Sequence, residues 1–196
     1  MEARPDQDTL LWLQFKEGSR DAFAAIYQRH ITPLIAYGLK LCPDSDLLKD
    51  QIQELFVELW QSRKNLSPTA AVRFYLFKAL RYKLIRLEKS RYLRDHTARI
   101  AMDGNHFQDS VETSIIEDEA SASQVDSLRQ AIKALTLRQQ EAIQLRYYQG
   151  FSNEQIANLM DLNYQSVNNL LHRALSRLKE IFKSPVFHLL LLWFSK

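Results

Sequence analysis

Two stretches of the sequence carry side chains suited to contact with nucleic acid, and the first is rich in cations. From Arg73 to Arg94 there are eight lysines or arginines and one acid, Glu88. Placed on a helix at about 100° per residue, the leucines of this stretch gather on one face and the cations on the opposite face. The cations suited to hold a phosphate backbone are Lys78, Arg81, Arg86 and Lys89.

Aromatic residues are interleaved with these cations. Phe74 and Tyr75 lie at the N-terminal end of the basic face, and Tyr82 lies within it. Lysine and arginine neutralise phosphates, and aromatic rings stack on unpaired bases. A solvated cationic face explains most charge runs, but the interleaved rings favour contact with nucleic acid here.

The second stretch, residues 152–175, has the pattern of two short helices that meet at a polar turn. Ser152 is followed three residues later by Gln155, which is the capping-box signature of a helix start. Asp161-Leu162-Asn163 then interrupts the pattern. The apolar side of the second helix carries Val167, Leu170, Leu171, Ala174 and Leu178. This arrangement predicts a helix-turn-helix whose second helix enters a DNA major groove, with an ordinary helical hairpin as the alternative.

The polar face of that second helix supplies the side chains that would read DNA. Asparagine and glutamine can make paired hydrogen bonds to adenine, whereas arginine more often holds a phosphate. The candidates are Gln165, Ser166, Asn168, Asn169, His172 and Arg173.

The composition indicates an all-α protein without a catalytic site. The chain has 196 residues, of which 46% are hydrophobic, with only four glycines and five prolines. The five histidines lack metal-ligand spacing, and no glycine-rich phosphate loop or nucleophile constellation occurs. We therefore expect no enzyme activity, cofactor, metal or small-molecule substrate.

The cysteine count and the N-terminus both point to the cytoplasm. The single Cys42 cannot form an internal disulfide, which fits a reducing compartment. The N-terminal residues lack the apolar core of a signal peptide. No stretch reaches the roughly 18 apolar residues that a membrane-spanning helix needs.

The helical pattern predicts two small helical domains joined by an acidic linker. Helices are expected at residues 6–17, 21–41, 46–62 and 70–94, and the pattern returns from residue 124. Between Ile100 and Leu128 the chain has seven acids and no lysine or arginine, a charge that should keep it off DNA. The predicted parts are a helical extension at 1–19, a first domain at 20–95, the linker at 96–123, a second domain at 124–183 and an apolar tail at 184–196.

The tail contains the sequence VFHLLLLWF at residues 186–194. It is strongly apolar but about half as long as a membrane span. A partner-binding segment, a membrane-surface segment and a helix folded back onto the domain are the three readings. Packing against protein is favoured, because an exposed apolar patch is otherwise unusual on a soluble protein.

A third motif, KDQIQELFVELW at residues 49–60, precedes the two DNA-binding candidates. It is similar to the polymerase-clamp-binding helix of bacterial sigma factors of the extracytoplasmic-function (ECF) type, usually D-x-V-Q-E-x-F-x-x-x-W. FYLFKALRYKL at residues 74–84 is similar to that family's promoter-melting helix, and residues 152–175 resemble its reader of the upstream promoter element. Because the three motifs occur in the family's order, residues 10–183 resemble an ECF sigma factor.

The resemblance implies an initiation factor that binds core RNA polymerase through its β′ and β subunits, directs it to promoter DNA and helps to melt that DNA. The family's clamp helix binds a coiled coil of β′, which implies polymerase contacts at Asp50, Gln53, Glu54 and Trp60, with a core position as the alternative for Trp60. The family also captures a flipped base in the loop before the basic helix, where Asn65 and Ser67 would contact the base edge.

The sequence LNYQSVNNLLHRAL at residues 162–175 most resembles ECF members from Bacteroidetes-type bacteria. This resemblance implies a membrane-bound anti-sigma factor as a further partner. Two departures are visible: Asn168 and Leu170 stand where many relatives have lysine or arginine, and Tyr82 stands where asparagine is common. The alternative function is a helix-turn-helix regulator that acts without binding polymerase. That reading leaves the Gln53-Glu54 helix and the acidic linker unexplained.

Overall fold

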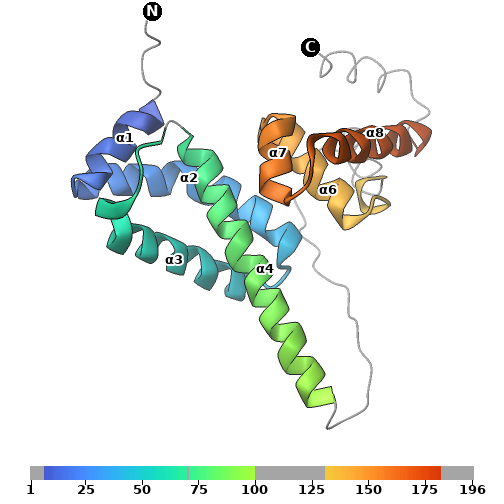
Figure 1. Ribbon diagram of the computed structural model, residues 1–196, viewed down its shortest axis with the longest axis horizontal. Helices are drawn as coiled ribbons and strands as arrows, with labels where there is room; N and C mark the ends of the chain where they lie inside the picture. The colour runs from blue at the N-terminus through green and yellow to red at the C-terminus, as the bar shows by residue number, and fades with distance from the viewer. Residues whose placement is uncertain (1–6, 70, 100–130, 182–196) are drawn as a thin grey trace, which may run out of the picture. The chain divides into compact units, whose positions relative to one another are not determined.

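The computed structural model describes residues 7–69, 71–99 and 131–181, and within these ranges all regular elements are helices (Figure 1). The predicted all-α class is therefore confirmed. The chain divides into two compact units between Val111 and Glu112. The predicted apolar tail and most of the predicted linker, from residue 100 onward, lie outside the described residues.

The described residues of the first unit form four α-helices and a short 3-10 turn. Polar side chains define two of the helix starts: Ser19 accepts a hydrogen bond from the Ala22 amide, and Asp44 accepts one from the Leu47 amide. Proline at position 33 does not end its helix, which continues for 22 residues. The elements are α1 (Gln7–Lys16), α2 (Arg20–Leu41), α3 (Ser45–Ser62), η1 (Arg63–Asn65) and α4 (Val72–Arg99).

The core of the first unit follows the predicted apolar faces. The apolar face that helical spacing gives α3 is buried, namely Leu48, Ile52, Leu55, Phe56 and Leu59. On α4 the expected apolar face is also buried, except that Leu87 is half-buried. Hydrophobic burial of these faces stabilises the packing of α3 and α4 against α2.

Helix α1 belongs to this core. Trp12 is 1% exposed and Phe15 is fully buried, and α1 packs against both α2 and α4. The predicted boundary between residues 19 and 20 therefore does not separate an extension from the domain. At the other end, α4 continues to Arg99, so residues 96–99 are helical where the sequence pattern predicted the start of a linker.

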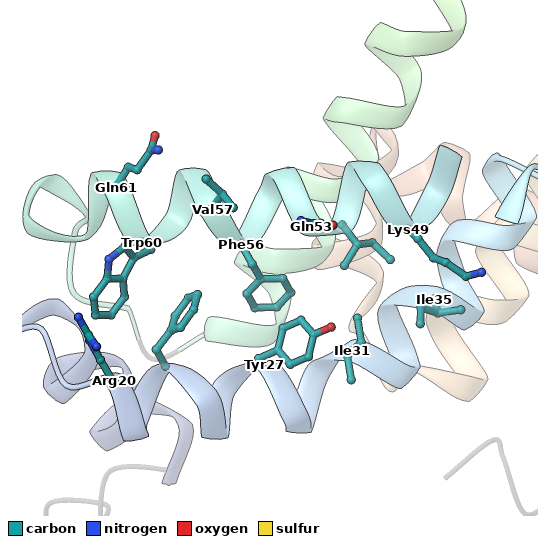
Figure 2. A pocket seen from close by; sticks show the side chains of 12 residues that line it. Arg20, Tyr27, Ile31, Ile35, Lys49, Gln53, Phe56, Val57, Trp60 and Gln61 are labelled. Carbon is teal, nitrogen blue, oxygen red and sulfur yellow. The ribbon is translucent and has the colours of Figure 1, made fainter. Parts of the chain in front are cut away.

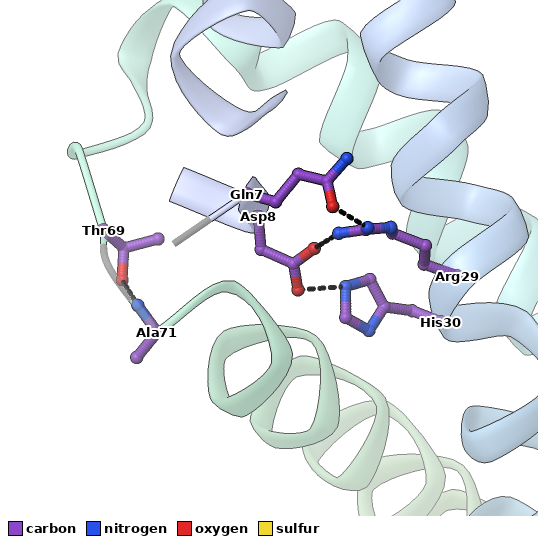
Figure 3. A network of polar contacts seen from close by, with 6 residues as sticks. All are labelled: Gln7, Asp8, Arg29, His30, Thr69 and Ala71. Atoms are coloured by element: carbon purple, nitrogen blue, oxygen red, sulfur yellow. Dashed lines mark hydrogen bonds and ion pairs between the residues drawn. The ribbon is translucent and has the colours of Figure 1, made fainter. Parts of the chain in front are cut away.

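A polar contact fastens the start of α1 to α2 (Figure 3). The Asp8 carboxylate lies 2.6 Å from the Arg29 guanidinium and 2.9 Å from Nε2 of the buried His30. Burial lowers the pKa of His30, and this effect outweighs the opposite influence of Asp8. Gln7 adds a hydrogen bond from Arg29 to the same network.

The described part of the second unit comprises α6 (Leu137–Ile143), the π-helical turn η2 (Gln144–Tyr148), α7 (Asn153–Met160) and α8 (Tyr164–Ile181). The predicted capping box at Ser152 is confirmed, and Thr136 forms a second one with Gln139. Helix α6 passes directly into the π-helical turn, in which the Gln149 amide bonds to the Gln144 carbonyl at 3.0 Å. Gly150 then ends the segment with a positive φ of 69°.

Gly38 lets α2 approach α3 closely, which gives a testable consequence for stability. A Cβ atom there would lie 3.1 Å from Cδ2 of Leu48 and would overlap its other terminal methyl group. Because Leu48 is itself buried, we expect Gly38→Val to lower the free energy of unfolding by about 1–3 kcal/mol. Urea unfolding followed by tryptophan fluorescence measures this change.

Ala24→Val is the matched control, because Ala24 is an exposed residue of the same helix. We expect it to change the free energy of unfolding by only about 0.5 kcal/mol. Equal stability of the two variants would show that Gly38 does not control the α2–α3 distance.

Candidate functional site

Helices α2 and α3 enclose an apolar groove of about 860 Å³, here called the α2–α3 groove (Figure 2). Its α2 wall is a row of residues spaced four apart, which places them on one helical face. Phe56 and Trp60 face this row from α3. The α2 row consists of Phe23, Tyr27, Ile31 and Ile35.

Two rows of mostly polar residues on α3 lie beside this groove. Lys49, Gln53, Val57 and Gln61 repeat every four residues and line the groove. Asp50, Glu54 and Glu58 repeat in the same way on the neighbouring row. The four predicted polymerase-binding residues therefore divide, with Gln53 and Trp60 at the groove and Asp50 and Glu54 in the acidic row.

Lys83 of α4 bridges the acidic row. Its Nζ lies 3.3 Å from a carboxylate oxygen of Glu54 and 2.7 Å from one of Glu58. The Lys83 side chain is only 15% exposed, whereas both glutamates are more than half exposed. Lys83 thus fixes α4 against α3 and balances charge beside a predicted partner-binding residue.

Trp60 occupies an intermediate position between core and surface. Its ring centroid lies 5.1 Å from that of Phe23 and 6.2 Å from that of Phe15. The Arg63 guanidinium lies 4.4 Å from the ring centroid, a cation–π contact. Trp60 is half-buried and also lines the groove, so the core and interface readings of this residue each describe part of its environment.

Neither the α2 wall of the groove nor Lys83 was predicted as part of a site from the sequence. The signal for the α2 wall was present, because residues 23, 27, 31 and 35 repeat every four positions beside a second, fully buried apolar row. Two apolar rows on one helix make a wider stripe than a single packing partner covers. Lys83 carried no such signal, since its pairing depends on how α4 lies against α3.

The segment between α3 and α4, residues 63–69, is here called the α3–α4 loop. The predicted base-contacting residues Asn65 and Ser67 are both exposed. The backbone carbonyl of Ser67 accepts a hydrogen bond of 3.1 Å from Nε1 of Trp12. At the end of the loop, the Thr69 hydroxyl accepts a hydrogen bond from the Ala71 amide (Figure 3).

Helix α4 presents the predicted cations on its outer side. Lys78, Arg86 and Lys89 are exposed and Arg81 is half-buried. Tyr82 lies among them with 68% of its surface exposed. Tyr75, nearer the α3–α4 loop, is partly covered, and burial raises its pKa, so its ring stays neutral at physiological pH.

Helices α7 and α8 form the predicted helix-turn-helix. Asp161 takes the left-handed conformation with φ 54°, which ends α7 and permits the sharp turn. Asn163 then caps α8 by accepting a hydrogen bond of 2.7 Å from the Ser166 amide. The apolar face of α8 is buried as predicted, except that Leu170 is half-buried.

The six predicted reading residues of α8 are not equivalent. Gln165, Asn169, His172 and Arg173 are exposed, whereas Ser166 and Asn168 are half-buried. Oδ1 of Asn168 accepts a 2.6 Å hydrogen bond from Nδ2 of Asn153 at the start of α7. Asn168 therefore joins the two helices, which leaves the exposed residues as the better candidates for contact with DNA.

The hydrogen bond between Asn153 and Asn168 predicts that these two residues are coupled in the stability of the protein. In a double-mutant cycle with alanine, we expect about 0.5–1.5 kcal/mol of coupling in the free energy of unfolding, because the bond is partly shielded from water. Gln165 and Asn169 form the control pair, since their 3.4 Å hydrogen bond is exposed. Equal coupling in the two pairs, measured by circular dichroism, would contradict a structural role for Asn168.

Among the residues that the structure describes, no three histidine, cysteine or acidic side chains are grouped so that they could hold a metal ion. Of the helices in the same ranges, none combines the length and apolar character needed to cross a membrane.

Two family models match the chain. The model "Sigma-70 region 2" matches residues 26–99, and the model "Sigma-70, region 4" matches residues 126–178. The first match ends with α4, and the second contains α6, α7 and most of α8. The two matches therefore fall on the two units in sequence order.

Individual relatives agree with these models. The ECF RNA polymerase sigma factor SigL of Mycobacterium tuberculosis (strain ATCC 25618 / H37Rv) is 28% identical over 158 residues, which cover 79% of this chain and 85% of SigL. The RNA polymerase sigma factor SigZ of Bacillus subtilis (strain 168) is 24% identical over 151 residues, covering 77% of this chain and 81% of SigZ.

Two solved structures share the fold. CnrH in complex with the cytosolic domain of CnrY matches with a TM-score of 0.59 and 20% identity, over 92% of this chain and 99% of CnrH. The sigma factor RpoE in complex with the anti-sigma factor NepR from Bartonella quintana matches with a TM-score of 0.61 and 22% identity, over 83% of this chain and 98% of RpoE.

Proposed function

Because this chain belongs to the sigma-70 family, in its ECF group, and directs RNA polymerase to promoters, we propose specific surfaces for each of its contacts. The observation that carries the assignment is the order of the two family regions, region 2 on the first unit and region 4 on the second. Each unit then binds a different part of the promoter. We further propose that the chain is a non-catalytic subunit without a cofactor and acts in the cytoplasm.

The α2–α3 groove is the proposed binding site for the coiled coil of the polymerase β′ subunit. Its apolar walls offer the buried centre that protein interfaces need, and Gln53 and Gln61 at its edge supply amides that can hydrogen-bond. Trp60 is the proposed anchor, because tryptophan at the centre of an interface often contributes most of its binding energy. Asp50 and Glu54 would contact polymerase from the adjacent acidic row.

The α3–α4 loop and the outer face of α4 are the proposed melting surface. Extraction of a base from the duplex costs a few kcal/mol, so the loop must offset that cost by stacking and hydrogen bonds. Asn65 and Ser67 are exposed where they can bond to a base edge. The cations Lys78, Arg81, Arg86 and Lys89 would hold the phosphates of the separated strand.

Helix α8 is the proposed reader of the upstream element. Gln165 and Asn169 are exposed amides suited to adenine, and Arg173 is suited to a phosphate. Asn168 lies at the helix junction, so its share in reading is smaller than that of Asn169 in this proposal. Weak binding of α8 to DNA is enough for promoter recognition, because binding of the first unit raises the effective concentration of the second unit at the promoter.

Run-off transcription with core polymerase tests the assignment. We expect the chain to support initiation that depends on the template, and Arg86→Glu to reduce permanganate-detected melting at least severalfold because a phosphate contact becomes repulsive. Lys40→Glu is the matched control, since Lys40 is an exposed cation on α2 that is not part of the proposed surface. It should leave melting unchanged.

Two results would count against the assignment. If the chain supports no initiation with core polymerase yet still binds DNA, it acts as a helix-turn-helix regulator without polymerase. If Arg86→Glu and Lys40→Glu melt promoters equally well, the outer face of α4 is not the melting surface.

We also propose that a membrane-bound anti-sigma factor holds the chain inactive. Support comes from the resemblance of residues 162–175 to ECF members regulated in this way. It also comes from the fold likeness to the sigma factor RpoE in complex with the anti-sigma factor NepR, and to CnrH in complex with the cytosolic domain of CnrY. We expect the chain to copurify with a membrane protein from solubilised membranes of its host. Recovery with polymerase alone would contradict this form of regulation.

A further inference from the structure

The α3–α4 loop is held by a hydrogen bond from a distant helix. Within the loop, the Leu66 amide approaches the Arg63 carbonyl at 3.4 Å, which is long for a hydrogen bond. By contrast, Nε1 of Trp12 donates to the Ser67 carbonyl at 3.1 Å across 55 residues of sequence. The backbone next to the proposed base-contacting side chains is thus tied to α1.

Trp12 is well placed to act as a rigid support. Its indole is 1% exposed, and its ring lies 5.3 Å from the rings of both Phe15 and Tyr75. A buried ring with neighbours on two sides cannot easily turn, so the direction of its N–H is set by the core. Phenylalanine would fill most of this space, but only the indole supplies a donor.

Helix α1 is itself fastened on both sides of Trp12. At its start, the Asp8 carboxylate bonds to Arg29 and lies beside His30 of α2 (Figure 3). Nearer its end, the ring of Phe15 stacks on that of Phe23, with centroids 5.4 Å apart. Because α1 is anchored to α2 at two points, a hydrogen bond from α1 transfers that rigidity to the loop.

We propose that Trp12 is a positioning residue that holds the α3–α4 loop in the conformation that receives the flipped promoter base. The inference rests on the proposed role of this loop in base capture. A loop ordered before binding loses less conformational entropy when the base enters. The favoured base gains the most binding free energy from an ordered loop, because its hydrogen bonds to Asn65 and Ser67 need defined geometry.

Trp12→Phe tests the proposal in two assays. In hydrogen exchange of the free protein, we expect faster exchange of amides in residues 64–69. In run-off transcription, we expect the preference for the favoured base at the captured position over the other three to fall about threefold to tenfold, the range of a single hydrogen bond. Complex formation with core polymerase should remain unchanged.

Tyr37→Phe is the matched control, because it removes a polar group from a fully buried ring in the same unit, one that packs against Phe77 of α4. Unchanged loop exchange and base preference in Trp12→Phe would overturn the proposal, as would an equal loss of preference in Tyr37→Phe. Hydrogen exchange needs neither polymerase nor DNA. Faster exchange in the loop without any change in base preference would therefore show that Trp12 restrains the loop. The same result would refute the proposal that this restraint acts in base capture.

Discussion

A run of aromatic rings is the contact on which the first unit depends. Tyr75, Trp12, Phe15 and Phe23 follow one another with ring centroids 5.3–5.4 Å apart, and Phe23 continues to Trp60 at 5.1 Å. The run begins beside the α3–α4 loop and ends in the α2–α3 groove. The surface proposed for base capture and the surface proposed for polymerase therefore share one packed core, which would let polymerase binding at the groove stabilise the loop.

Charge on the first unit is divided so that neighbouring surfaces attract different partners. The α2–α3 groove is apolar with few charges at its edge, which suits a protein partner. The outer side of α4 is cationic, which suits phosphates. Lys83 lies between the two surfaces and pairs with Glu54 and Glu58, so the acidic row of α3 stays close to α4 despite its own repulsion.

The second unit gains its geometry from hydrogen bonds at helix ends. Capping boxes at Thr136 and Ser152 start α6 and α7, and Asn163 starts α8. The Asn153–Asn168 bond then links α7 to α8. With one amide used in this way, Gln165 and Asn169 remain as exposed amides on α8. So small a set agrees with the proposal that α8 depends on polymerase and on the first unit for much of its affinity.

The sequence by itself determined the helices, their buried faces and the order of the functional motifs, because helical period and capping residues act over a few positions. The family followed from three such local motifs. Only the tertiary structure decided which residues of different helices and loops meet: Lys83 with Glu54, Asn168 with Asn153, and Trp12 with the α3–α4 loop. Those contacts depend on the angles and distances at which helices pack, which side-chain volumes across the whole core set together and no local pattern records.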